Sequence, residues 1–222
     1  MGNKRIIMVG HKAQAGKDTF FKIVEPLGYT RFALADRLKE VVADLYQFSS
    51  EQMYGSLKDV EDLRYSNTID SKFIKPKRLP RPRPEGFHLE QQDLIIENPE
   101  YRPYLTPRRI LQIFGQQMRS IYPDIWASYA YNVTANRLLK DNDNLILTDF
   151  RFQNEAAFAE RWCKDHNVGL IFIKVTRPIL INNSSDISEN DLNDFSRWHY
   201  ILANDSDLKT YYDKVHSLVE TL

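Results

Sequence analysis

The chain has 222 residues, of which 42% are hydrophobic, enough for one large domain or for one domain that carries an insertion. Its 30 basic and 30 acidic side chains balance, so composition gives no reason to expect a nucleic acid or a membrane surface as a partner. The single cysteine, Cys163, excludes an internal disulfide framework and is typical of a reducing cytosol, so we expect a soluble cytoplasmic protein.

The first predicted element is a short buried strand from Arg5 to Val9, followed directly by Gly10. Its apolar run is too short for a signal peptide or a membrane span. Apolar residues at helical spacing then predict a helix that begins at about Lys17 and is closed by Gly28. Strand, glycine-containing loop and helix, in this order, are the context in which a phosphate-binding loop occurs.

The loop GHKAQAGKDT, residues 10–19, matches the phosphate-loop pattern G-x-x-x-x-G-K-S/T only in part. His11 stands where the first glycine is expected, and Asp18 follows Lys17 where serine or threonine is usual. Backbone N–H groups in such a turn attract an anion, the helix dipole adds to this, and the lysine contributes a point charge. His11 fits if its φ is negative, or if it adopts the left-handed region that histidine visits more than most residues. We expect phosphate binding, with Mg²⁺ served by Asp18 through water or by the Thr19 hydroxyl; the alternative is a βα turn without a ligand.

The next segments predict a short strand in YTRFALAD, residues 29–36, and a helix in RLKEVVADLYQF, residues 37–48. From about residue 56 to 104 the composition changes. The closely spaced prolines of KPKRLPRPRPEG, residues 75–86, exclude a helix and favour an extended polyproline conformation. We interpret residues 56–104 as an insertion or flexible lid, whose basic charge could contact a phosphate or nucleic acid, although a solvated loop is the simpler interpretation.

The remainder of the chain predicts alternating helices and strands. Thr106 is the expected N-cap of a helix that begins at Pro107. The later elements are a helix at 125–139, a strand at 144–152, a helix at 153–165, strands at 168–175 and 199–205, and a terminal helix at 208–222. Such alternation predicts an α/β fold with a mostly parallel sheet that is covered by helices on both faces.

A second group of candidate residues lies in LTDFRFQNE, residues 147–155. Asp149 and Arg151 follow an apolar strand at its carboxyl end, where open α/β sheets bind their ligands. The aspartate could organise Mg²⁺ or a sugar, the arginine could reach a phosphate, and Glu155 in the next helix could share the cleft. The alternative is an ordinary salt bridge with helix capping.

A third group lies on the helix that begins at Pro107. Arg108, Gly115 and Arg119 share its polar face, and glycine there would let a ligand approach the backbone. The two arginines are roughly 16 Å apart along the axis, too far to hold the same phosphate easily. An amphipathic helix with a solvated polar face is the alternative. Lys39 could contact an acceptor phosphate and Trp126 could stack on a base, although a surface lysine and a core tryptophan are the commoner situations.

These motifs, in this order, resemble the bacteriophage deoxynucleoside-monophosphate kinases, a branch of the P-loop nucleoside-monophosphate kinase superfamily. The similar stretches span roughly residues 5–220 and are GKDT, FALADRLK, TPRRILQIFGQQMR with a following tryptophan, D-x-R-x-x-x-E, and LANDSDL. The resemblance implies a three-layer P-loop NTPase fold, with one kinase domain over residues 1–222 and the lid-like insertion at about 56–104. It also implies transfer of the ATP γ-phosphoryl group to a deoxynucleoside 5′-monophosphate, with Mg²⁺.

The resemblance assigns roles to particular residues. Those expected to bind ATP are Ala13, Gln14, Ala15, Gly16, Lys17, Asp18, Thr19, Asn204 and Asp205. Those expected around the acceptor nucleotide are Lys39, Arg64, Arg108, Gly115, Trp126, Asp149, Arg151 and Glu155. Lys17, Arg108 and Arg151 are the expected catalytic residues, because the reaction must neutralise charge on the transferred group, and Asp18 is the expected metal ligand.

The resemblance further suggests a homodimer, located in the host cytoplasm if the chain is phage-encoded. Two alternatives stay open. One is a nucleotide-binding P-loop protein that has lost turnover, which His11 would favour. The other is a P-loop kinase that acts on another phosphorylated metabolite or on a nucleic-acid end, which the basic proline-rich run would suit.

Overall fold

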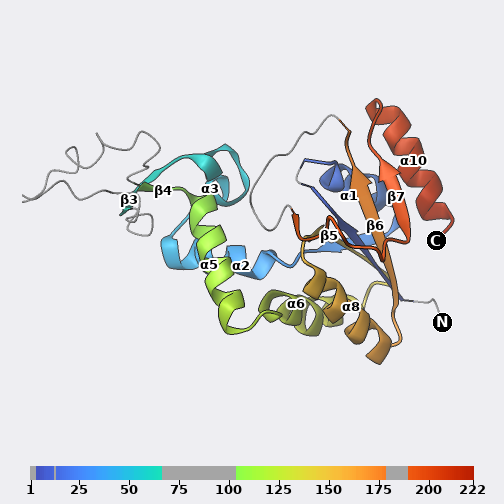
Figure 1. Cartoon of the computed structure of the whole chain (residues 1–222), viewed down its shortest axis with the longest axis horizontal. Helices are drawn as coiled ribbons and strands as arrows, with labels where there is room; N and C mark the ends of the chain where they lie inside the picture. Colours follow the sequence, from blue (N-terminus) through green and yellow to red (C-terminus); the bar gives the residue numbers. More distant parts are fainter. Residues whose placement is uncertain (1–3, 13, 67–103, 179–189) are drawn as a thin grey trace, which may run out of the picture. The chain divides into compact units, whose positions relative to one another are not determined.

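A computed structural model describes the chain at residues 4–12, 14–66, 104–178 and 190–222 (Figure 1). These residues divide between two compact units, one formed by Met1–Glu40 with Gln117–Leu222 and the other by Val41–Gln116. Ala13, most of the expected insertion and its proline-rich run lie outside the described residues. No helix in the described part of the chain is both long enough and apolar enough to cross a membrane.

The first unit contains a five-stranded sheet in the order β2-β5-β1-β6-β7. Its strands are β1 (Arg5–Gly10), β2 (Tyr29–Phe32), β5 (Asn144–Phe150), β6 (Gly169–Thr176) and β7 (Tyr200–Ala203). Every neighbouring pair is parallel, and Ile7 of the central strand is paired with Ile146 on one side and Ile171 on the other. The carboxyl ends of all five strands therefore meet at one edge of the sheet.

Helices cover both faces of this sheet, as the alternation of strands and helices predicts (Figure 1). On β1, Ile6 and Met8 belong to one core and Ile7 and Val9 to the other, and all four are fully buried. The first core includes side chains of α6 (Ile125–Tyr129) and α8 (Gln153–Asp165). The second includes side chains of α1 (Lys17–Val24) and α10 (Leu208–Glu220). The fold is a three-layer α/β fold.

Local sequence explains two of the helix boundaries in this unit. After α1, a 3-10 turn η1 (Glu25–Leu27) ends at Gly28, whose φ of 87° suits glycine. Asp207 is the N-cap of α10 and accepts a hydrogen bond from the Thr210 N–H at 2.8 Å. One expected helix is not uniform: residues 125–139 form α6, a π-helix η4 (Ala130–Ala135) and α7 (Asn136–Leu138).

The second unit contains short elements that the sequence analysis did not predict. They are α3 (Ser50–Tyr54), the 3-10 helix η2 (Ser56–Asp59), and an antiparallel pair formed by β3 (Asp62–Ser66) and β4 (Tyr104–Leu105). Most of α2 (Asp36–Tyr46) and α5 (Pro107–Ile121) also belongs to it. The Thr106 hydroxyl caps α5 as expected, accepting the Arg109 N–H at 3.1 Å.

Candidate active site

The loop between β1 and α1 contains three residues with positive φ. Its φ angles are 93° at His11, 57° at Gln14 and 110° at Gly16, all in the region that favours glycine. Of the two conformations that the sequence allows at His11, the structure therefore shows the one with positive φ. Successive residues that alternate between right- and left-handed conformations direct their N–H groups into one concave nest, which binds anions.

Lys17 places its ammonium group inside this turn. The residue is only 7% exposed, and its Nζ donates hydrogen bonds to the carbonyl oxygens of Lys12 and, at 3.1 Å, of His11. A buried ammonium needs such partners, because desolvating a charge without compensation is costly. The positive charge is thus held against the carbonyl oxygens of the first half of the loop.

The N-terminus of α1 follows directly on this loop. Gly16 is its N-cap and has no side chain with which to satisfy the first N–H groups of the helix. Asp18 is exposed in the first turn and Thr19 is partly exposed beside it. Mg²⁺ bound with a nucleotide usually takes one or two carboxylate oxygens in addition to phosphate oxygens. Asp18 carries such a carboxylate and Thr19 a hydroxyl oxygen, so the end of the loop fits a nucleotide-bound Mg²⁺.

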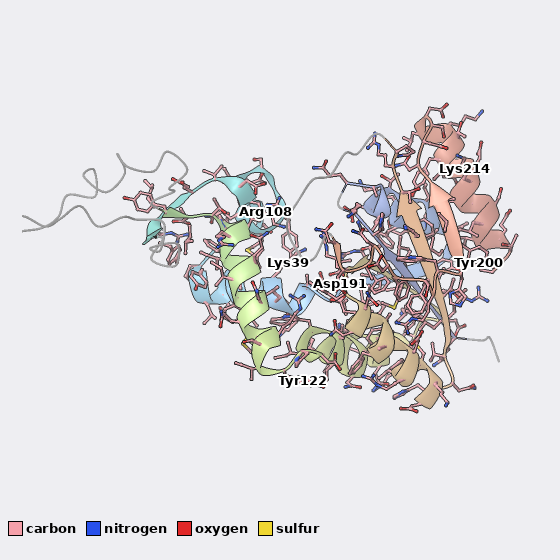
Figure 2. All side chains as sticks on the ribbon, in the orientation of Figure 1. Lys39, Arg108, Tyr122, Asp191, Tyr200 and Lys214 are labelled. Carbon is pink, nitrogen blue, oxygen red and sulfur yellow. The ribbon has the colours of Figure 1, made fainter. Side chains whose placement is uncertain are left out.

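Asn204, expected near ATP, contacts the loop directly. Its Nδ2 donates a hydrogen bond to the Ala15 carbonyl oxygen at 2.9 Å, and a Cβ added to Gly16 would lie 2.5 Å from this nitrogen. Asp205 points to α10 instead, where its carboxylate accepts a hydrogen bond from Lys214 Nζ at 2.6 Å (Lys214 is labelled in Figure 2). This bond holds the pKa of Asp205 below its ordinary value.

Asp149 connects the carboxyl ends of two strands. Its two carboxylate oxygens accept the backbone N–H groups of Leu34 at 2.9 Å and Ala35 at 2.8 Å. These residues follow β2, the strand paired with β5. Asp149 therefore fixes the start of the segment that leads into α2 and to Lys39.

Glu155 is a buried carboxyl, 4% exposed, that organises the residues after β5. It accepts the backbone N–H groups of Arg151 at 2.9 Å and Phe152 at 3.0 Å. Burial raises its pKa to about 7, and the negative charge of Asp149 acts in the same direction. The two N–H donors and Arg119, whose guanidinium lies 3.9 Å from Glu155, act in the opposite direction. These contacts position the backbone of Arg151, as the helix-capping interpretation predicts.

Two further charged residues at this edge were missed by the sequence analysis. Arg31 in β2 donates a hydrogen bond from Nε to the Thr148 hydroxyl at 3.0 Å and lies 3.8 Å from the Asp36 carboxylate. The pKa of Asp36 is raised, chiefly by burial and also by Asp149, while Arg31 opposes this. A charged residue inside the short strand YTRF was the available signal for Arg31.

Three of the expected acceptor-site residues belong to the second unit. Arg108 on α5, labelled in Figure 2, makes a two-pronged ion pair with Asp59, with one contact at 3.0 Å. Arg64 makes a similar pair with Asp62 through contacts of 2.9 and 2.6 Å, which lowers the pKa of that carboxyl. Gly115 is buried on α5. Trp126 belongs to the first unit and is 6% exposed, so its ring is mostly covered by protein.

The parallel sheet, the turn that follows its central strand and the enclosed lysine are the features of a P-loop α/β fold. No protein-family model matches the chain. It is 22% identical over 215 residues to a protein of Acanthamoeba polyphaga mimivirus provisionally named a deoxynucleotide monophosphate kinase, a match that covers 96% of this chain and 94% of that protein.

Solved structures that match over nearly the whole chain include two enzymes. One is the APS kinase of Mycobacterium tuberculosis, at 9% identity and a TM-score of 0.44, with 99% of each chain covered. The other is the dephospho-CoA kinase of Campylobacter jejuni, at 13% identity and a TM-score of 0.43, with 97% of this chain and 95% of that chain covered.

Proposed function

We propose that this protein is an ATP-dependent kinase that transfers the γ-phosphoryl group of ATP to a deoxynucleoside 5′-monophosphate. The observation that carries the proposal is the loop between β1 and α1, in which the buried Lys17 ammonium lies within a turn of left-handed residues at a helix N-terminus. The distant mimivirus relative supports the choice of acceptor, because its name specifies that substrate class.

The donor side of the reaction is assigned to the loop. The N–H groups of residues 14–19 and the Lys17 ammonium would neutralise the ATP phosphates as negative charge moves onto the leaving oxygen. Asp18 and Thr19 would be the protein contacts of a nucleotide-bound Mg²⁺, which would supply positive charge to neutralise the phosphates. Ala13 and Asp205 keep the ATP-binding roles implied by the resemblance as predictions.

The acceptor side is assigned to cations near the ends of β2 and β5. Lys39 in α2 and Arg151 after β5 would hold the nucleoside monophosphate, with Asp149 and Glu155 fixing the backbone that carries them. Because this acceptor is already anionic, the reaction needs in-line alignment and charge neutralisation more than a strong general base.

Arg64 and Arg108 are also proposed to bind the nucleoside monophosphate, because each carries a guanidinium group. Each already holds a carboxylate with two parallel donors, and the planar guanidinium binds a phosphate in the same way. Gly115 beside the substrate and Trp126 against its base stay predictions, as do a homodimer and a cytoplasmic location.

The proposal is tested by coupled measurement of ADP release with ATP, Mg²⁺ and a panel of acceptors. The panel should contain the four common deoxynucleoside monophosphates, ribonucleoside monophosphates, other phosphorylated metabolites and oligonucleotides with free 5′ ends. We expect ADP release that depends on a deoxynucleoside monophosphate. Lys17→Ala should abolish it, whereas Lys22→Ala, a matched change at an exposed lysine of the same helix, should leave it intact.

The other outcomes distinguish the alternatives. ATP binding without release of ADP for any acceptor would identify a P-loop protein that has lost turnover. Release only with oligonucleotides, or only with another metabolite, would identify a kinase for that acceptor. Lys17→Ala that melts like the wild type but keeps full activity would contradict the assignment of the loop.

A further inference from the structure

Two side chains donate hydrogen bonds to backbone carbonyl oxygens of the loop between β1 and α1: Asn204, which follows β7, and Tyr211 on α10. Asn204 Nδ2 donates to the Ala15 carbonyl oxygen at 2.9 Å, and Tyr211 Oη donates to the Gly16 carbonyl oxygen at 3.2 Å. Tyr211 is 1% exposed, in the core shared by α1 and α10. From these contacts we infer that Asn204 and Tyr211 are positioning residues that direct the phosphate-binding N–H groups of Gly16 and Lys17.

The geometry of the peptide bond links these contacts to phosphate binding. A peptide unit is planar and trans, so its C=O group and the N–H group of the next residue point in opposite directions. When Asn204 holds the Ala15 carbonyl, the Gly16 N–H must point to the other side of the chain. The Gly16 carbonyl oxygen accepts both the Tyr211 hydroxyl at 3.2 Å and the Phe20 N–H of α1 at 2.9 Å, so Tyr211 and the helix together direct the Lys17 N–H in the same way. Two side-chain donors on one side of the loop therefore orient the Gly16 and Lys17 N–H groups toward the other side, where an anion would bind.

The conformation of the loop needs such support. Gly16 has a φ of 110° and packs so tightly on Asn204 that a side chain there would collide with the amide. His11 and Gln14 also have positive φ, which non-glycine residues adopt only when the surrounding structure holds them there. Lys17 holds the carbonyl oxygens of the first half of the loop, and Asn204 and Tyr211 hold those of the second half.

This division has a consequence for nucleotide binding. Lys17 contacts the first half of the loop with the same ammonium group that is proposed to contact phosphate. The bonds from Asn204 and Tyr211 involve no group that would contact the nucleotide phosphates. They can therefore keep the Gly16 and Lys17 N–H groups aligned while the Lys17 ammonium exchanges its carbonyl partners for phosphate oxygens.

Asn204 and Tyr211 are both fixed to the rest of the first unit. The Asn204 backbone N–H donates to the Thr176 carbonyl oxygen at 2.7 Å, which ties it to the end of β6. Tyr211 belongs to the same buried core as Val215 and Val219 of α10 and Phe20 of α1. Both donors therefore rest on rigid elements, as precise positioning of a binding loop requires.

The first test uses the protein without nucleotide. Hydrogen exchange at the Gly16 and Lys17 amides should be about 3- to 10-fold faster in Tyr211→Phe and in Asn204→Ala, since each change removes one neutral hydrogen bond from the loop. Tyr212→Phe is the matched control, because Tyr212 is 45% exposed on the same helix, and its exchange should equal that of the wild type. Unchanged exchange in Tyr211→Phe and Asn204→Ala would overturn the inference.

The second test measures ATP affinity by calorimetry and rests on the proposed function. Tyr211→Phe and Asn204→Ala should each weaken ATP binding about 3- to 10-fold, whereas Tyr212→Phe should bind ATP within about twofold of the wild type. Equal ATP affinity in Tyr211→Phe, Asn204→Ala and the wild type would overturn the inference. If the wild type does not bind ATP, the proposed function fails. The hydrogen-exchange measurement then still tests whether Asn204 and Tyr211 position the loop.

Asn204→Asp gives a pH-dependent readout that a merely structural role would not produce. An ionised carboxylate cannot donate to the Ala15 carbonyl and would repel it, whereas a protonated carboxyl can donate. Relative to wild type at the same pH, ATP affinity should therefore be lower than that of Asn204→Ala at pH 8 and should recover at least twofold at pH 5. Identical losses in the two variants at both pH values would contradict the positioning role.

Discussion

Replacing His11 with glycine should give a more stable protein than replacing it with alanine, because His11 has a φ of 93°. A residue with a Cβ in the left-handed region is strained by about 1–2 kcal/mol. Glycine removes this strain but costs roughly 0.5–1 kcal/mol more in backbone entropy on folding. The difference predicts that His11→Gly is about 1 kcal/mol more stable than a variant that keeps the Cβ and lacks the ring.

His11→Ala is that variant, so comparing it with His11→Gly separates backbone strain from the loss of imidazole contacts. For a chain of 222 residues, about 1 kcal/mol corresponds to a difference in Tm of roughly 2–4 °C. The assay is thermal unfolding of both variants and the wild type without nucleotide. Equal Tm values for His11→Gly and His11→Ala, or a lower value for His11→Gly, would refute the proposed strain.

Three further predictions concern the carboxyl ends of the strands and the second unit. The pKa of Glu155 is raised from 4.5 to about 7, so between these pH values the folded state keeps a proton that the unfolded state releases. The free energy of unfolding of the wild type, relative to that of Glu155→Gln, should therefore fall by roughly 3 kcal/mol as pH rises from about 4.5 to above 7. Urea unfolding at several pH values measures this, and a constant difference between the two proteins would contradict it. Asp36→Asn should change kcat by less than about threefold if the acceptor is a phosphate, and a loss on the order of 100-fold would instead indicate a hydroxyl acceptor activated by Asp36 as a general base. Arg108→Ala should lower kcat/KM for the acceptor by more than about 10-fold, and equal kinetics in this variant and the wild type would show that Arg108 does not belong to the site. Asp59→Ala should lower the free energy of unfolding by less than about 1 kcal/mol, because the Arg108–Asp59 ion pair is exposed.

The sequence predicted the elements of the first unit well where its patterns are strong. The helix expected at 153–165 matches α8 at both ends, because the pattern of apolar residues is regular and Glu155 forms the capping interaction there. Four of the five strands were predicted from short apolar runs next to turn residues, whereas β2 was predicted from YTRFALAD, which contains a charged residue within the strand. In the second unit, α3 and the β3–β4 pair were missed, since short polar elements carry little periodic signal.

The candidate site was only partly predictable, because most of its contacts join distant parts of the chain. The loop was found from its lysine and its context, but the sequence left both signs of φ open at His11. The bonds from Asp149 to Leu34 and Ala35 span more than 100 residues, and no local pattern predicts them. Spacing on α10 would mark Tyr211 as a buried residue but not as a donor to the phosphate loop.

Transfer of a labelled phosphoryl group tests the central claim most directly. ATP carrying ³²P at the γ position would be incubated with Mg²⁺ and each deoxynucleoside monophosphate, and the products separated by chromatography. We predict that the label appears in the corresponding deoxynucleoside diphosphate with the wild type and with Lys22→Ala, and that it does not with Lys17→Ala. Bound ATP with no label in any deoxynucleoside diphosphate, or equal labelling by wild type and Lys17→Ala, would contradict the proposed kinase.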